Sequence, residues 1–270
     1  MIDERVRRIL IYFLWLMFYI FLFGYVTFFL IIPFYIIAFI ISFSPLTEKV
    51  WRFISGVRPL RLSQEKERLL PIFTEVYEKA LRQDEYLPEN INLYIQESMD
   101  INAFAFGRTT LVLTKGSIVL LSDDNLKGLI AHELGHFANR DTMFALFTSV
   151  TNLPLSIILR LLNVARTKME ETSKTSFFVK LVKSFLDLIY FQFKYLELIG
   201  DLIIMHDRRK GEYVADIYAF WLGYGAELAE ALIEIYQIST EKRQSVKEMV
   251  RATHPAITKR IERLENRLDR

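Results

Sequence analysis

The N-terminal part of this chain is almost wholly apolar. Residues 9–47 carry no charged side chain, and their apolar section is too long for one transmembrane helix of about 20 residues. The run therefore predicts two short spans that meet near Gly24, because glycine tolerates turn geometry. Basic residues lie on both sides of the run, so the positive-inside rule places both ends in the cytoplasm. We expect a transmembrane hairpin over residues 1–47.

A soluble pattern replaces the apolar one from Ser63 onward. Apolar residues at helical spacing predict a helix from there to Leu81. Alternating residues then predict two strands, followed by a hairpin that turns at Lys115-Gly116. The strands and hairpin arms cover residues 91–96, 102–107, 109–114 and 117–121. Together they predict a small antiparallel sheet.

The next predicted helix runs from Leu129 to Arg140 and contains His132-Glu133-Leu134-Gly135-His136. Ser122, Asp123 or Asp124 can cap it, and acidic groups near its start suit the helix dipole. Two histidines four residues apart project from one face of a helix, one turn above each other. Their imidazoles can therefore converge on one metal ion.

The second half of the chain mixes apolar runs with charged ones. Met143 to Leu159 predicts a short third membrane segment, and residues 166–174 predict a charged loop. Between residues 177 and 204, the charged side chains fall on one helical face. Three interpretations of this stretch stay open: an amphipathic helix on the membrane, a fourth crossing, and an ordinary bundle helix. Further helices are predicted at residues 207–223, 226–236 and 241–270, the last of them broken at His254-Pro255.

The composition indicates a membrane protein and limits which metal ligands and partners the chain can have. The chain is 52% hydrophobic with a mean hydropathy of +0.21, above the usual soluble average, so part of it belongs in lipid. It contains no cysteine, so any metal must be held by histidine and carboxylate. A net charge of +2 gives no electrostatic reason to expect a nucleic-acid partner.

A catalytic zinc site needs three protein ligands and an open position, so the two histidines require a third ligand from elsewhere. Our candidate is Glu212, on a later helix. Asp216 shares its helical face and can accept a hydrogen bond from the outer nitrogen of a ligand histidine. Which of His132 and His136 it serves stays open. Glu133 is the predicted general base, which takes a proton from the attacking water and passes it to the leaving amine.

Two other histidines lie outside this motif. His254 is a candidate donor to the oxyanion that forms during peptide hydrolysis. A helix-capping or packing role beside Pro255 explains it equally well. His206 fits a surface or membrane-edge position. We therefore expect one Zn²⁺ per chain, with His254 as a second catalytic candidate.

These motifs together resemble the HtpX membrane proteases and the related type I CAAX prenyl proteases. Besides the two-histidine helix, the resemblance is carried by residues 102–107, 209–216, 253–255 and 260–261. It implies a mostly helical α+β fold of the glutamate-zincin type, with transmembrane helices and with Glu212 as third ligand. It also implies that an extended substrate pairs with the edge formed by Asn102, Ala103, Phe104 and Ala105. In that family Asn102 and His254 would touch the substrate or transition state.

The expected protein is a multi-pass protein of the cell membrane whose catalytic domain faces the cytoplasm. Its expected activity is zinc-dependent endopeptidase cleavage of polypeptides, and the resemblance implies misfolded or damaged membrane proteins as substrates. A membrane hairpin is expected at residues 1–47, a membrane-associated insertion at 142–204, and the two parts of the catalytic domain at 48–141 and 205–270.

Other functions compete with this interpretation. A CAAX-prenyl-type processing protease is disfavoured because the chain is short for the many spans that enclose the chamber of those enzymes. An intramembrane-cleaving protease is disfavoured by the charged residues that border the two-histidine helix. A catalytically weak or inactive adaptor is opposed by the presence of both Glu133 and Glu212. If the chain were a structural membrane protein with an incidental zinc site, a chelator would cause no loss of peptide hydrolysis.

Overall fold

The computed structural model describes residues 17, 21, 24, 25, 29, 32–172, 177–241 and 257–269. The chain divides into two compact units, Met1–Ser44 and Pro45–Arg270. In the first unit, helix α2 (Ile32–Ser42) exposes large apolar side chains such as Ile36 and Ile40. Within the described ranges, no helix combines the length and the apolar character that a membrane crossing requires. Most of the predicted hairpin at 1–47 lies outside those ranges.

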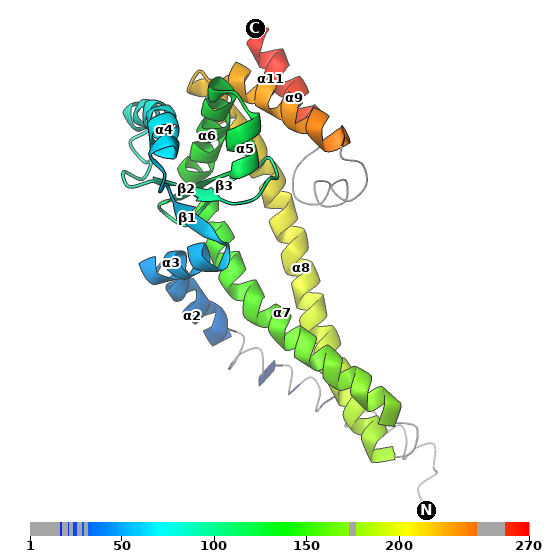
Figure 1. The fold of residues 1–270 in the computed structure, drawn as a ribbon. Helices are drawn as coiled ribbons and strands as arrows, with labels where there is room; N and C mark the ends of the chain where they lie inside the picture. The colour runs from blue at the N-terminus through cyan, green and yellow to red at the C-terminus, as the bar shows by residue number, and fades with distance from the viewer. Residues whose placement is uncertain are drawn as a thin grey trace, which may run out of the picture. The chain divides into compact units, whose positions relative to one another are not determined.

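The second unit contains a four-stranded mixed sheet in the order β1-β2-β4-β3 (Figure 1). Its strands are β1 (Val57–Pro59), β2 (Asn92–Gln96), β3 (Ala103–Phe106) and β4 (Thr110–Thr114). β2 and β4 run parallel, whereas β1 with β2 and β3 with β4 pair antiparallel. The expected purely antiparallel sheet is therefore wrong, because the β3–β4 hairpin folds back so that β4 lies beside β2. β3 is left at the edge.

The predicted hairpin at Lys115-Gly116 is also wrong. Residues Lys115–Leu120 form the short helix α5, which begins where the Thr114 side chain accepts a hydrogen bond from the Ser117 amide. A Cβ atom at Gly116 would lie 2.4 Å from backbone oxygens of Met99 and Asp100. This glycine therefore permits a close approach between two segments, and it does not serve a hairpin turn.

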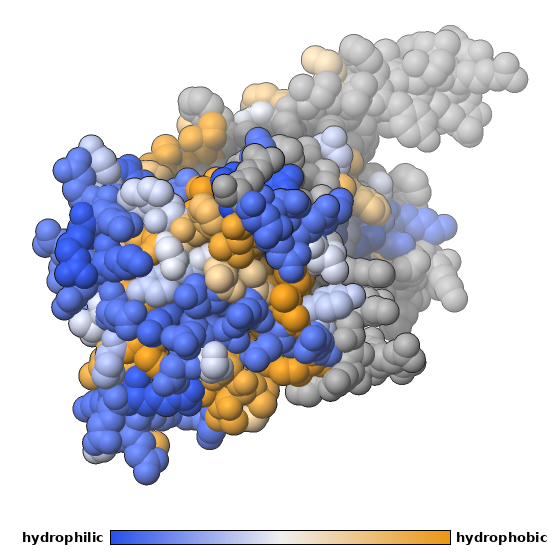
Figure 2. All heavy atoms as spheres, turned by 90° about the horizontal axis from the view of Figure 1, so that it is seen from above, coloured by the Kyte–Doolittle hydropathy of each residue, from blue (hydrophilic) through white to orange (hydrophobic). Residues whose placement is uncertain are grey.

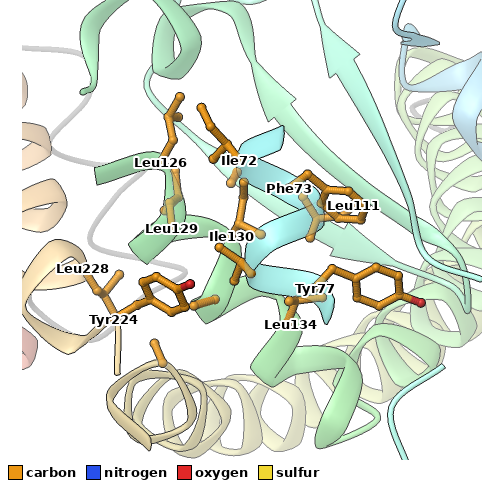
Figure 3. Close-up of a cluster of buried hydrophobic side chains, with 14 of the residues drawn as sticks. Ile72, Phe73, Tyr77, Leu111, Leu126, Leu129, Ile130, Leu134, Tyr224 and Leu228 are labelled. Carbon is orange, nitrogen blue, oxygen red and sulfur yellow. The ribbon is translucent and has the colours of Figure 1, made fainter. Parts of the chain in front are cut away.

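The two faces of the sheet pack against different helices, as the alternation of side chains along a strand requires. One face meets α4 (Ser63–Gln83) and α6 (Asp123–Ala138) in the main hydrophobic core. Figure 3 shows Phe73 of α4, Leu111 of β4 and Ile130 of α6 in this cluster. On the other face, a smaller cluster consists of Phe106, Val112 and Leu146.

Helix α6 is the centre of the second unit. Its predicted cap is confirmed, because Ser122 Oγ accepts a hydrogen bond of 3.1 Å from the Asn125 amide. Asp123 and Asp124 occupy its first turn, where they suit the positive end of the helix dipole. Nearly all side chains from Leu126 to Phe137 are buried against neighbouring elements. The two-histidine motif thus lies on a rigid element.

Long helices follow α6 (Figure 1). The other described helices are α3 (Pro45–Ile54), α7 (Asp141–Thr172), α8 (Phe177–Trp221), α9 (Gly225–Glu241) and α11 (Ile257–Leu268). The loop expected at 166–174 is wrong through residue 172, because its arginine, lysine, methionine and glutamates are good helix formers. The helices expected at 177–204 and 207–223 are one helix, since no proline separates them. The predicted mostly helical α+β architecture is confirmed.

Candidate metal centre

The two histidines of α6 face one another at the centre of the candidate site. The ring centroids of His132 and His136 lie 4.9 Å apart, with the rings nearly perpendicular at 88°. His132 is buried, whereas His136 is half-buried. This is the arrangement that their four-residue spacing on one helical face predicts.

Glu212 approaches both histidines from α8. Its Oε2 lies 3.5 Å from His132 Nε2, and its Oε1 lies 3.8 Å from His136 Nε2. One donor atom from each residue falls within 4.8 Å of the other two, so the three could hold a metal ion. Ligand atoms in a tetrahedral zinc site with bonds of about 2.0–2.1 Å lie roughly 3.3 Å apart. The donor set therefore fits zinc, and two of the donor-to-donor distances, 3.5 and 3.8 Å, are close to this value.

A glycine between the histidines lets α8 come this close. A Cβ atom at Gly135 would lie 2.8 Å from the Ala215 Cα atom and 3.0 Å from the Tyr218 Cβ atom. Real Cβ atoms do not approach a backbone that closely, so any larger residue must push the two helices apart. Gly135 therefore sets the distance at which Glu212 meets the histidines.

Asp216 serves His132, which answers the question that the sequence leaves open. Its Oδ1 lies 3.0 Å from His132 Nδ1, one helical turn after Glu212. A hydrogen bond from Nδ1–H to this carboxylate selects the tautomer whose Nε2 lone pair faces Glu212. Burial and the Arg260 guanidinium oppose a charged imidazole, but Asp216 and Glu212 outweigh them and raise the pKa of His132 to about 9. A metal ion that binds His132 Nε2 would have to displace the proton that this nitrogen carries in the charged imidazole.

Asp141 is the corresponding partner of His136, and sequence reasoning missed it. Its Oδ2 lies 3.1 Å from His136 Nδ1, and its Oδ1 accepts a hydrogen bond of 2.8 Å from the Asn139 side chain. Asp141 is the first residue of α7, directly after the sharp connection in which Arg140 has a φ of 62°. An acidic residue five positions after the second histidine was the available signal.

Arg260 of α11 belongs to the motif that carries the family resemblance, but sequence reasoning gave it no role in the site. It is only 5% exposed, and its Nε and Nη2 donate to the two oxygens of Asp216 at 2.9 and 2.6 Å. Its Nη1 lies 2.8 Å from Glu212 Oε2. Burial opposes its charge, but Asp216, Glu212 and Glu133 together raise its pKa. One guanidinium thus neutralises the buried carboxylates that surround His132.

The candidate base, Glu133, lies on α6 beside His132 and is 5% exposed.

The candidate substrate edge is strand β3. Phe104 projects towards the smaller hydrophobic cluster, and Ala103 and Ala105 project towards the main core. Asn102 precedes this edge strand, and its backbone amide already donates to Ser117 Oγ at 2.8 Å. This leaves the Asn102 side chain, which is exposed, as the group that could meet a substrate.

Two predicted positions are not placed. His254 lies outside the described residues, so its assignment as an oxyanion donor stays a prediction. His206 belongs to α8, but its side chain also falls outside the description. The described site therefore contains His132, Glu133, His136, Glu212 and Asp216 of the predicted set.

The sequence of this chain is similar to the sequences of known proteins. The sequence pattern of the group described as Peptidase family M48 matches residues 63–268. A Protease HtpX homolog of Bacillus licheniformis is 27% identical over 256 residues, which cover 85% of this chain and 82% of the relative. Protease HtpX of Buchnera aphidicola subsp. Schizaphis graminum is 24% identical over 218 residues, 71% of each chain. The crystal structure of S. mikatae Ste24p aligns with a TM-score of 0.49 and 20% identity, over 89% of this chain and 57% of that one.

Proposed function

Because this chain is a metalloprotease that belongs to peptidase family M48, we propose that it is a zinc endopeptidase of the cell membrane. Its proposed substrates are misfolded or damaged membrane proteins, which it would remove as part of quality control. The observation that carries the proposal is the convergence of His132, His136 and Glu212, whose donor atoms lie within 4.8 Å of one another. Histidine and carboxylate donors are the ligands of a catalytic zinc in a chain without cysteine.

The proposed chemistry divides the residues into ligands, orienting groups and a base. His132, His136 and Glu212 hold the metal, while Asp216 and Asp141 each fix the orientation of one imidazole. When bound, zinc supplies Lewis acidity, which activates water near neutral pH and polarises a peptide carbonyl.

Glu133 carries the proton. Its carboxylate accepts a proton from the attacking water and then delivers it to the nitrogen of the departing amine. Its burial on α6 keeps bulk water away from this transfer and strengthens the electrostatic interactions around it. His254 is proposed to donate a hydrogen bond to the oxyanion.

We also propose that the substrate binds as an added strand on β3. β3 is an edge of the sheet and packs against α6, which carries both histidines. Main-chain hydrogen bonds along Ala103, Phe104 and Ala105 would hold an extended peptide without strict demands on its side chains, with Asn102 at one end. Such tolerance suits an enzyme that acts on unfolded segments of many proteins.

Exposed apolar surface supports the membrane part of the proposal. The uncharged run of residues 9–47 continues into α3, where Leu46, Val50 and Phe53 are exposed, the last by 86%. Figure 2 shows that hydrophilic side chains prevail on one face of the described molecule, with hydrophobic ones between them. We propose that these apolar residues contact lipid and that the catalytic domain faces the cytoplasm.

Replacement of the base tests the proposal most directly. The Glu133→Gln variant should retain zinc and fold normally, but its cleavage of casein in detergent should fall by about 10²–10⁴-fold. Glu230→Gln, at an exposed position of α9, is the matched control and should cleave at the wild-type rate. Removal of the metal by a chelator should abolish cleavage, and added zinc should restore it.

Other outcomes would identify other functions. Cleavage by Glu133→Gln at the wild-type rate would contradict the proposed mechanism. A wild-type protein that binds unfolded membrane segments but cleaves none would act as an adaptor. Cleavage confined to prenylated C-terminal peptides would identify a processing protease.

A further inference from the structure

Glu48 is a buried carboxylate that the proposed chemistry does not use. It lies on α3 with its side chain only 8% exposed, facing the turn that joins β3 to β4. The amides of Arg108 and Thr109 each donate to it at 3.1 Å, and the Thr109 and Thr110 hydroxyls donate at 2.7 and 2.5 Å. Arg52 also contacts it at 3.4 Å. A buried charge with several donors is held in one position, and it fixes the turn that supplies them.

The opposite side of this turn is held by α7. Thr142 Oγ1 donates to the Gly107 carbonyl at 2.7 Å, and the Gly107 amide donates back to the Thr142 carbonyl at 3.2 Å. Gly107 has a φ of 65°, and a Cβ atom there would lie 2.6 Å from the Glu48 carboxyl group. Thr142 directly follows Asp141, the partner of His136. The turn is therefore clamped between α3 and the residue pair that also orients a candidate metal ligand.

The other edge of the sheet has a comparable clamp. Glu65 of α4 accepts hydrogen bonds from the amides of Arg61 and Leu62 at 3.1 and 3.2 Å. It also pairs at 2.6 Å with Arg58 of β1, whose guanidinium holds the pKa of Glu65 at about 2. Each edge strand thus contacts one carboxylate that binds two backbone amides, but Glu65 binds the amides at the start of its own helix and reaches β1 through Arg58. The two edge strands differ in their neighbours. β3 packs against α7 and against α6, which carries both histidines.

We propose that Glu48 is a positioning residue for the substrate, which fixes the β3–β4 turn so that β3 holds a paired peptide in line with the metal centre. This inference rests on the proposed function, which takes β3 as the pairing strand. Peptide pairing depends on main-chain hydrogen bonds, and a misplacement of about 1 Å is enough to weaken a positioned contact strongly. Thr142 supports the same turn from α7.

Loss of this clamp should weaken substrate binding more than it slows the chemical step, because the metal ligands and Glu133 lie on other elements. The Glu48→Gln variant keeps the shape of the side chain but turns an NH₂ group towards donors. With the full, metal-loaded chain in detergent, the KM for an unstructured fluorogenic peptide should rise by about 3–10-fold. The kcat should stay within about twofold of wild type. Glu48→Ala should raise KM further.

Glu65→Gln is the matched control at the opposite edge. It removes a carboxylate that also accepts two backbone amides, so its melting temperature should fall by an amount similar to that of Glu48→Gln. Its KM should equal that of wild type, because the proposal pairs the substrate with β3 and not with β1. Equal increases of KM in the two variants would show a general loss of stability and would overturn the inference. An unchanged KM in Glu48→Ala would overturn it as well.

Hydrogen exchange separates this inference from the function on which it rests. In the metal-loaded Glu133→Gln variant, a bound peptide should slow exchange of the amides of residues 103–106. Addition of Glu48→Gln should remove most of that protection at the same peptide concentration. Protection that persists in the double variant overturns the role of Glu48 alone. If the peptide protects no β3 amide even with Glu48 present, strand pairing itself is wrong, and the proposed function fails at that step.

Discussion

The two histidines of the metal centre lie one helical turn apart, yet their surroundings differ. His132 is 4% exposed, and its partners Asp216 and Arg260 are 4% and 5% exposed. The His136 side chain is 16% exposed, and its partner Asp141 is 36% exposed. The His132 side is a buried network of charges, whereas the His136 side is a single hydrogen bond that water can reach.

The two sides also differ in how far the chain must fold to assemble them. Asp141 is five residues from His136 in sequence, so a helix and a tight connection bring them together. Arg260 is 128 residues from His132, and it lies on α11, which packs against α9 and α8. The support of His132 therefore depends on tertiary packing, while that of His136 is local. Substitutions on the His132 side should cost more.

The largest expected effect follows the loss of the buried cation. Arg260→Met leaves the carboxylates of Asp216 and Glu212 without their main positive partner in the metal-free protein. Removing one member of a buried charge network typically costs about 3–5 kcal/mol. Denaturant unfolding of the metal-free protein in detergent should show a loss of that size. Arg267→Met, at an exposed site on the same helix, should be nearly neutral, and equal losses in both would contradict the contrast.

The second prediction concerns the close contact between α6 and α8 at Gly135. Gly135→Ala would place a methyl group 2.8 Å from the Ala215 backbone, which cannot move alone, so α6 and α8 must part. We expect a loss of about 3 kcal/mol, near the upper end for overpacking, together with weaker metal binding. Gly211→Ala is the control on the His136 side, because the atoms nearest to its Cβ atom would be those of the Asp141 carboxylate, the first at 2.7 Å.

The Asp141 carboxylate, which the new methyl group of Gly211→Ala would meet, lies at the end of a side chain and can shift. Gly211→Ala should therefore change stability much less than Gly135→Ala, as measured by melting temperature with and without zinc. The reverse order would mean that the His136 side is the rigid one, and the comparison would have to be inverted.

The same contrast explains what could be predicted from the sequence. The Ser122 cap, the shared face of His132 and His136, and the pairing of Glu212 with Asp216 depend on helical periodicity, which is visible in a short window. The structure brings these residues together as expected. Features that follow from helical periodicity were therefore predictable, whereas Asp141, which is close to His136 in sequence but lies beyond the end of α6, was missed.

Features that depend on long-range packing were not predictable. The parallel pairing of β2 with β4 follows from where the β3–β4 hairpin folds, and alternation alone does not specify strand order. The role of Arg260 was hidden for the same reason, since its pattern is that of any basic residue on an amphipathic helix. Lys115-Gly116 misled because a glycine can serve close packing as well as a turn.

A third prediction measures the His132 side through the metal itself. Asp216→Asn keeps the shape of the side chain but loses the charge that accepts from His132 Nδ1 and balances Arg260. Loss of such an orienting carboxylate typically lowers metal affinity by about 10–100-fold. Competition against a chromophoric chelator should reveal a decrease in zinc affinity of that size. Unchanged affinity would mean that Arg260 and packing alone orient the imidazole.

The smallest effect is expected on the His136 side. Asp141→Asn leaves an amide oxygen that can still accept from His136 Nδ1, and water can replace the hydrogen bonds of the lost carboxylate oxygen at a side chain that is 36% exposed. The variant also loses an acidic group from the first turn of α7, which typically costs about 0.3–1 kcal/mol. Zinc affinity in the same competition assay should therefore fall by less than about tenfold. A loss as large as that of Asp216→Asn would show that a local, hydrated partner orients a ligand as strongly as a buried network does.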